Sequence, residues 1–135
     1  MIGLDTNVLV RYLTQDDPKQ STRASRLIEV DLTAAQPGFI GLVVLAEMCW
    51  VLTRIYGASD DELAATAQDM LDSPQFHLER RDVVLATVRH QQGRRGSKAG
   101  FVDALIAQVA QAEGCVHTVT FDKTAVRSAG MRLLA

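Results

Sequence analysis

Short apolar segments alternate with segments of helical periodicity along the whole chain. The strand-like segments are residues 2–4, 39–40, 76–78, 116–120 and 131–134. Strands that are joined through helices run parallel, and parallel sheets are buried between their helices. The alternation therefore predicts one α/β domain over residues 1–135, with a central, largely parallel sheet of about four to five short strands flanked by helices.

Capping residues mark the expected helix boundaries. Asp17 and Pro18 are typical of an N-cap and a first helical position, and Ser59 with Glu62 has the spacing of a capping box. Gly57 is typical of a helix end. We expect helices over residues 6–13, 18–30, 42–56, 59–71, 82–92, 100–113 and 122–128, the first capped by Thr6 or Asn7.

Four acidic residues stand almost alone in apolar surroundings. Asp5 and Asp122 each follow a strand-like segment, whereas Glu47 and Asp103 lie within apolar helices. An isolated acid in a segment fit for a core is costly unless something pairs with it. Because few basic residues are equally isolated, the pattern indicates a divalent cation as the missing partner.

The expected topology brings these acids together. In an open α/β sheet, ligands bind beyond the carboxyl ends of the strands, where the following helices begin. Two carboxylates about 4 Å apart repel each other by on the order of 4 kcal/mol at an effective dielectric constant of 20. Mg²⁺ or Mn²⁺ would turn this repulsion into attraction, because hard cations take oxygen ligands. Such a site supports metal-assisted phosphoryl transfer.

Each acid also has a simpler interpretation. Asp5 could be only a helix N-cap, and Glu47 could pair with Arg54 or reach solvent. Asp103 could favour the positive N-terminus of its helix. Asp122 could be an ordinary cap at a strand end, paired with its neighbour. Four separate explanations are less economical than one shared site.

Four motifs occur in a characteristic order along the chain. They are Asp5-Thr6-Asn7, Glu47 in an apolar helix, Asp103-Ala104-Leu105-Ile106-Ala107 and Thr120-Phe121-Asp122-Lys123. Their order resembles that of the PIN-domain ribonucleases, and most closely that of the VapC-like toxins of bacterial toxin–antitoxin modules. The resemblance covers the whole chain and implies a metal-dependent endoribonuclease.

The resemblance also implies a role for each acid. Asp5 and Asp103 would be the main ligands of Mg²⁺ or Mn²⁺. Glu47 and Asp122 would complete the site, directly or through water, and would help to orient the attacking water.

Further residues and partners follow from the same resemblance. Thr6 and Asn7 would support the site, and Thr120 would hydrogen-bond an acid or a phosphate. The substrate would be RNA. The expected protein partners are a second copy of the chain and a cognate antitoxin, whose C-terminal segment would cover the site and place a basic side chain among the acids.

The densest basic run precedes the helix of Asp103. It contains Arg94, Arg95 and Lys98, which are well placed to bind the RNA backbone beside a phosphodiester site. A solvated loop is the alternative interpretation.

Composition limits the class of protein. The chain has 135 residues, of which 47% are hydrophobic and 22% charged, so it can bury a core and is neither a disordered tail nor collagen-like. A net charge of −2 excludes a polycation that coats nucleic acid but not an enzyme that cleaves it. Cys49 and Cys115 are expected to be buried, reduced thiols. We expect a cytoplasmic protein without a targeting segment or membrane span.

Rival functions remain open at this level. A haloacid-dehalogenase-like phosphatase, which is metal-dependent, needs an acid two residues after Asp5, where this chain has Asn7. A receiver-like phosphoacceptor domain needs paired acids at the end of the first strand. The third alternative is a catalytically silent PIN-type module that binds RNA or protein.

Overall fold

The computed structural model describes residues 1–94 and 100–134. The chain divides into two compact units, the first comprising Met1–Gly57 with Asp69–Arg81 and the second Ala58–Gln68 with Asp82–Ala135. The elements in the described residues are, in chain order, β1 (Ile2–Gly3), α1 (Thr6–Thr14), α2 (Pro18–Arg26), the π-helical segment η1 (Leu27–Asp31), β2 (Gly38–Ile40), α3 (Leu42–Tyr56), α4 (Asp60–Asp72), β3 (Phe76–Leu78), α5 (Arg81–Gln92), α6 (Phe101–Ala112), β4 (Val119–Thr120), α7 (Lys123–Ala129) and β5 (Arg132–Leu133).

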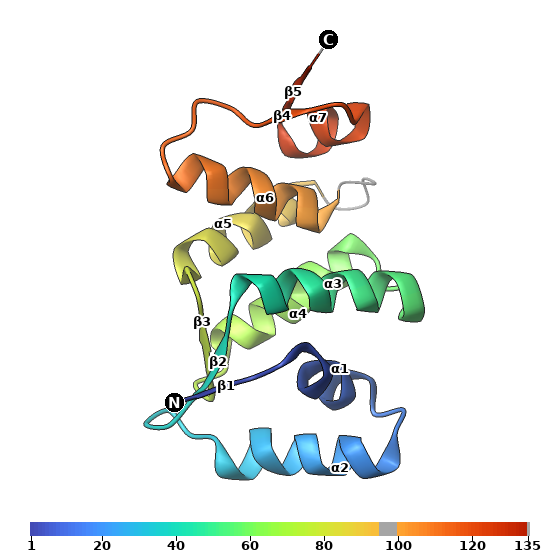
Figure 1. The fold of residues 1–135 in the computed structure, drawn as a ribbon, viewed down its shortest axis with the longest axis vertical. Helices are drawn as coiled ribbons and strands as arrows, with labels where there is room; N and C mark the ends of the chain where they lie inside the picture. The colour runs from blue at the N-terminus through green and yellow to red at the C-terminus, as the bar shows by residue number, and fades with distance from the viewer. Residues whose placement is uncertain (95–99, 135) are drawn as a thin grey trace. The chain divides into compact units, whose positions relative to one another are not determined.

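The first unit contains a parallel sheet in the order β1-β2-β3 (Figure 1). Ile2 pairs with Gly38, and Phe39 pairs with His77. Helix α1 follows β1 directly and packs against α2 and α3. The carboxyl end of β1 therefore lies beside the start of a helix, and this places Asp5 at the junction.

Close packing beneath the sheet requires glycine in β2. A Cβ atom at Gly38 would lie 2.6 Å from Cδ1 of Leu4 and 2.8 Å from Cδ1 of Leu32. Both leucines are buried, as are Leu9 and Ile40. These apolar contacts stabilise the short strands, which have few backbone hydrogen bonds of their own.

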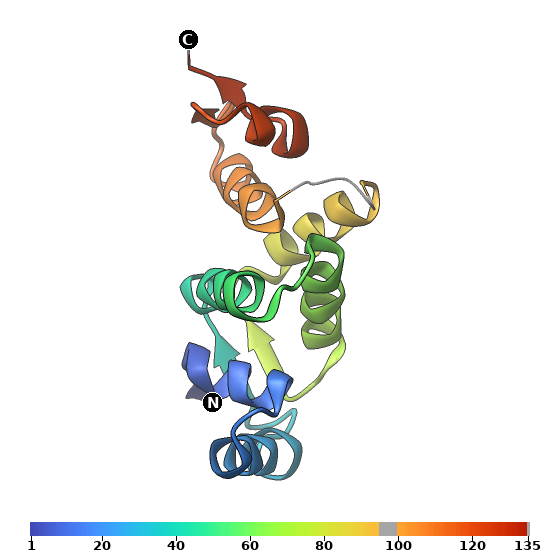
Figure 2. The ribbon, with the colours of Figure 1, turned by 90° about the vertical axis from the view of Figure 1, so that its right-hand side faces the viewer.

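The second unit contains a smaller parallel sheet. Strands β4 and β5 pair with each other, Val119 opposite Arg132, and α7 is the crossover between them (Figure 2). Helix α7 packs against α6, and it ends at Gly130, whose φ of 69° is a left-handed conformation that favours glycine. Asp122 therefore lies between a strand and a helix, as Asp5 does in the first unit.

The α/β class and the parallel pairing are confirmed. In the described residues the five strands form two sheets, of three and two strands, rather than one. Helix α3 covers the predicted residues and ends at Gly57, whose φ is 69°. The capping box is present, with Glu62 accepting from the Ser59 amide and Ser59 from the Glu62 amide, both at 3.1 Å.

Other local expectations were wrong. Asp5 rather than Thr6 or Asn7 is the N-cap of α1. The second predicted helix is present over its whole range, but it leaves α-helical geometry after Arg26 and continues as η1. The fourth strand is limited to β4, and Cys115, which lies in the irregular segment before it, is exposed rather than buried. Among the described residues, no helix combines the length and apolar character that a membrane span requires.

Candidate active site

Asp5 caps the helix that begins immediately after β1. Its backbone is extended, with φ of −83° and ψ of 159°, and its Oδ1 accepts a hydrogen bond of 2.8 Å from the Thr6 amide. The amide of Leu4 donates to the Phe39 carbonyl at 2.9 Å, which continues the pairing with β2 up to the residue before Asp5. Sheet and cap together hold the Asp5 carboxylate at the end of the strand.

Thr6 connects Asp5 to the second acid of this unit. Its hydroxyl donates to Oε1 of Glu47, which lies on α3. Thr6 is buried, whereas Asp5 and Glu47 are both exposed. One buried threonine thus donates to both carboxylates, through its amide and its hydroxyl. The contact supports the role that the resemblance implies for Thr6, which stays a prediction.

The simpler interpretation of Glu47 as a partner of Arg54 is wrong. The Arg54 guanidinium lies over the Trp50 ring, 4.4 Å from its centroid, in a cation–π contact. Asn7 is exposed and lines a groove between α1 and α2 together with Arg11 and Arg23. Its predicted supporting role stays a prediction.

The second unit gathers three carboxylates. Asp103 lies in the first turn of α6 and is partly buried. Burial raises its pKa, and the negative charges of Asp122 and Asp60 raise it further. Among the described residues, none of the three forms an ion pair. Negative charge therefore accumulates around Asp103.

Asp122 is held in the same way as Asp5. It is the N-cap of α7, and its Oδ1 accepts a hydrogen bond of 2.8 Å from the Thr124 amide. Its own amide donates to the hydroxyl of Thr120 at 3.0 Å. Thr120 thus contacts the backbone of the acid, while its predicted contact with a carboxylate or a phosphate stays a prediction.

Asp60 is the acid that sequence reasoning missed. It lies in the first turn of α4, and its Oδ1 accepts a hydrogen bond of 2.8 Å from the amide of Phe101, the first residue of α6. In the sequence Asp60 stands within the capping box of its own helix, and acidic residues are common in the first turn of a helix. Its presence there therefore needs no further explanation. Nothing in the local sequence pattern indicates a contact 41 residues away.

The predicted RNA-binding cations are only partly described. Arg94 donates from Nη2 to the Arg127 carbonyl at 2.8 Å. Arg95 and Lys98 lie outside the described residues. The role of this basic run stays a prediction.

The donor set suits a hard divalent cation. Carboxylate oxygens are the ligands that Mg²⁺ and Mn²⁺ prefer. Burial is the main cause of the raised pKa of Asp103, and a cation beside it would offset the repulsion from Asp122 and Asp60 that raises this pKa further. Within residues 1–94 and 100–134, no group of three or more Asp, Glu, His or Cys side chains is arranged to hold a metal ion. The shared site of all four predicted acids stays a prediction.

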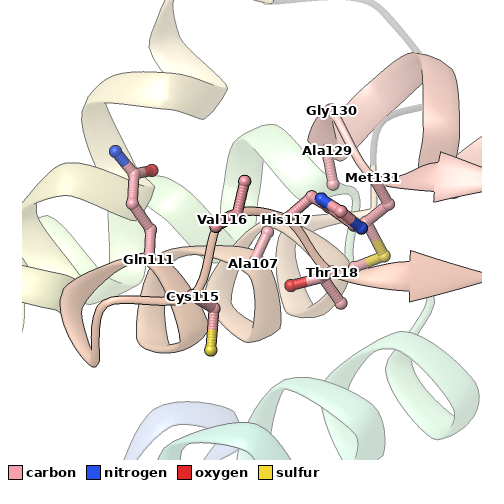
Figure 3. A pocket seen from close by; sticks show the side chains of 9 residues that line it. All are labelled: Ala107, Gln111, Cys115, Val116, His117, Thr118, Ala129, Gly130 and Met131. Carbon is pink, nitrogen blue, oxygen red and sulfur yellow. The ribbon is translucent and has the colours of Figure 1, made fainter.

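A cavity in the second unit is a separate feature. It has a volume of about 390 Å³ and is lined by Ala107, Gln111, Cys115, Val116, His117, Thr118, Ala129, Gly130 and Met131 (Figure 3). No carboxylate lines it, and Figure 3 shows the Cys115 thiol directed away from the His117 ring. The cavity is therefore distinct from the carboxylates around Asp103.

Comparison with family models supplies the deciding observation. The model of the PIN domain matches residues 2–130, which include all four predicted acids and span both units. The chain belongs to the PIN domain family. PIN domains are generally nucleases and typically bind divalent metals. A comparison with curated proteins finds no significant match.

We predict that Thr6→Val weakens the first unit of this PIN domain. Valine keeps the volume but removes the hydroxyl that donates to Glu47, so the free energy of unfolding should fall by about 1 kcal/mol. Urea denaturation measures the change. Thr6→Ser, which keeps the hydroxyl, should lose clearly less stability, and equal losses in both variants would show that the hydrogen bond contributes nothing.

The raised pKa of Asp103 predicts a pH-dependent stability difference. The folded chain binds this proton more tightly than the unfolded chain, so stability falls as pH rises from the ordinary pKa of 3.8 through the raised value. Asp103→Asn should therefore be more stable than the wild type at pH 7 without metal. The difference should disappear below the ordinary pKa. Thermal melting across this range measures it, and a constant difference at every pH would contradict the prediction.

Proposed function

We propose that this PIN domain is a metal-dependent endoribonuclease that acts as the toxin of a toxin–antitoxin pair. Its family membership supports a nuclease. The observation that carries the metal dependence is the negative charge around Asp103, whose pKa is raised first by burial and then by the charges of Asp122 and Asp60. Such a cluster is unfavourable without a cation and favourable with one.

In this proposal Mg²⁺ or Mn²⁺ is held by the four carboxylates that the sequence singles out. Asp5 and Asp103 are the main ligands, and Glu47 and Asp122 complete the set directly or through water. When bound, the ion would polarise a water molecule and neutralise charge on the phosphate.

The chain's own residues position this chemistry. Thr6 holds Asp5 and Glu47 through two hydrogen bonds, so neither carboxylate needs to be ordered when substrate arrives. Glu47 and Asp122 accept hydrogen bonds from the attacking water and direct its oxygen toward the phosphorus. Asn7 and Thr120 support the acids or contact the phosphate.

Substrate binding is assigned to the basic run before α6. Arg94, Arg95 and Lys98 bind phosphate oxygens of the RNA backbone, which favours RNA over neutral substrates but does not by itself read its sequence. The sequence position of Arg94 supports this assignment, because Arg94 lies a few residues before the helix that carries Asp103. Base recognition requires contacts that these three residues do not supply.

The proposed protein partners follow from the toxin role. A cognate antitoxin covers the site with its C-terminal segment and places a basic side chain among the acids, where it replaces the metal's positive charge. A free toxin cleaves RNA and stops growth. The proposed location is therefore the cytoplasm, where RNA and antitoxin are present.

We also propose a homodimer. Support comes from α3, which exposes Val43 by 83%, Trp50 by 57% and Ile55 by 71%. Exposed apolar side chains grouped on one element are typical of protein interfaces. Sedimentation velocity of the purified chain at micromolar concentration should give the mass of a dimer. A monomer across that range would contradict this part of the proposal.

Two alternatives are tested by the same cleavage experiment. A catalytically silent PIN-type module is favoured by one observation: Asp5 and Asp122 both serve as helix caps, which accounts for them without a metal. A metal-dependent phosphatase is disfavoured by Asn7, because that chemistry needs a second acid there.

The central prediction concerns labelled total RNA. The purified chain should cleave it with Mg²⁺ or Mn²⁺ and not with EDTA, and Asp5→Asn and Asp103→Asn should each lower the rate by more than about a hundredfold. Mutation of a residue that only supports a metal ligand lowers activity roughly 10- to 100-fold, so loss of a ligand itself should lower it more. Expression of the wild type, but not of either variant, should arrest growth.

Asp69→Asn is the matched control, because it removes an exposed acid of α4 outside the predicted site. Its cleavage rate should equal that of the wild type. Binding of RNA without cleavage under any metal condition would identify a silent module. Cleavage of a phosphomonoester but not of RNA would identify a phosphatase.

A further inference from the structure

The residue that precedes helix α6 offers no side chain to cap it. Its N-cap residue is Gly100, which has no side chain to accept a hydrogen bond from the first turn. The first amides of a helix have no partner within the helix and need an external acceptor. Asp60 provides this acceptor, because its Oδ1 accepts a hydrogen bond from the Phe101 amide nitrogen at 2.8 Å. The start of the helix that carries Asp103 is therefore fixed from α4.

Gly100 affects the Asp103 side chain through the space that it leaves. A Cβ atom at position 100 would lie 2.9 Å from Oδ2 and 3.3 Å from Cγ of Asp103, both closer than ordinary contact allows. The backbone at Gly100, with φ of −69° and ψ of 117°, is open to any residue. Glycine is thus not needed for the backbone. It leaves the space that the Asp103 carboxylate occupies.

We propose that Asp60 and Gly100 are positioning residues for the Asp103 carboxylate. Asp60 fixes where α6 begins, and Gly100 lets the carboxylate fold back over that point. Together they hold Asp103 from two sides before metal or substrate binds. This inference rests on the proposed metal-dependent nuclease, and it adds two residues that neither the motifs nor the resemblance indicates.

The charge of Asp60 supports this assignment. A carboxylate at a helix N-terminus is stabilised by the helix dipole, which offsets part of its repulsion with Asp103. The negative charge of Asp60 would increase the attraction for a bound cation. Asp60 therefore contributes both a hydrogen bond and an electrostatic effect.

Two substitutions separate these contributions. Asp60→Asn keeps an oxygen that can accept the Phe101 amide but removes the charge, whereas Asp60→Ala removes both. Gly100→Ala leaves the backbone unstrained and forces the Asp103 carboxylate to rotate away. The matched controls are Asp69→Asn on the same helix and Gly93→Ala, where a Cβ atom meets only ordinary contacts of 3.6 and 3.7 Å.

Three measurements apply to every variant. They are kcat and KM for RNA cleavage, the Kd for Mn²⁺ by calorimetry without RNA, and hydrogen exchange of the Phe101 amide. Asp60→Ala and Gly100→Ala should each weaken Mn²⁺ binding and lower kcat by about 10- to 100-fold, with KM nearly unchanged. Only Asp60→Ala should lose Phe101 protection. Asp60→Asn should keep that protection and most of kcat, and both controls should match the wild type.

Other outcomes separate this inference from the proposed function. If the wild type cleaves RNA but Gly100→Ala and Asp60→Ala keep its Kd for Mn²⁺ and its kcat, only the positioning role is overturned. If the wild type binds Mn²⁺ without cleaving RNA, the nuclease proposal fails, while the Mn²⁺ affinities of the variants still decide the positioning role. If the wild type neither binds Mn²⁺ nor cleaves RNA, both are overturned.

Discussion

Parallel pairing of very short strands is the constraint on which the rest of this structure depends. A parallel neighbour can be reached only through a crossover that returns the chain to the same end of the sheet. Each crossover here begins directly after its strand, so the first turn of a helix lies at the strand's carboxyl end. Asp5 and Asp122 occupy that junction in their respective units, and the helix start determines where their carboxylates lie.

Helix capping and metal binding make compatible demands on these two acids. A cap places a carboxylate oxygen against the first amides and fixes the side chain without a basic partner. In both Asp5 and Asp122, Oδ1 accepts a hydrogen bond from an amide in the first turn of the helix. Both acids are therefore helix caps, as the simple interpretation expects, and this does not exclude a second role. The cap is what would keep such a ligand ordered before the metal arrives.

Partial burial and repulsion from neighbouring carboxylates distinguish Asp103 from the other three predicted acids. Its pKa is raised first by burial and then by Asp122 and Asp60, so ionising it costs free energy in the folded chain. A chain under selection for stability alone gains nothing from this arrangement, because a neutral amide would remove the cost. The metal-ligand role that we propose for Asp103 in this PIN domain would account for a carboxylate at this position.

The sequence by itself determined the α/β class, the parallel strands, most helix boundaries and the identity of the four isolated acids, because periodicity and capping are local properties. It did not indicate that Thr6 donates to Glu47 or that Asp60 caps α6, since each contact joins residues 41 positions apart. Asp60 already has a sufficient explanation in its own helix, and Gly100 reads as an ordinary helix boundary. Only the tertiary structure decided which side chains hold the acids, because contacts between distant elements depend on packing that local patterns do not encode.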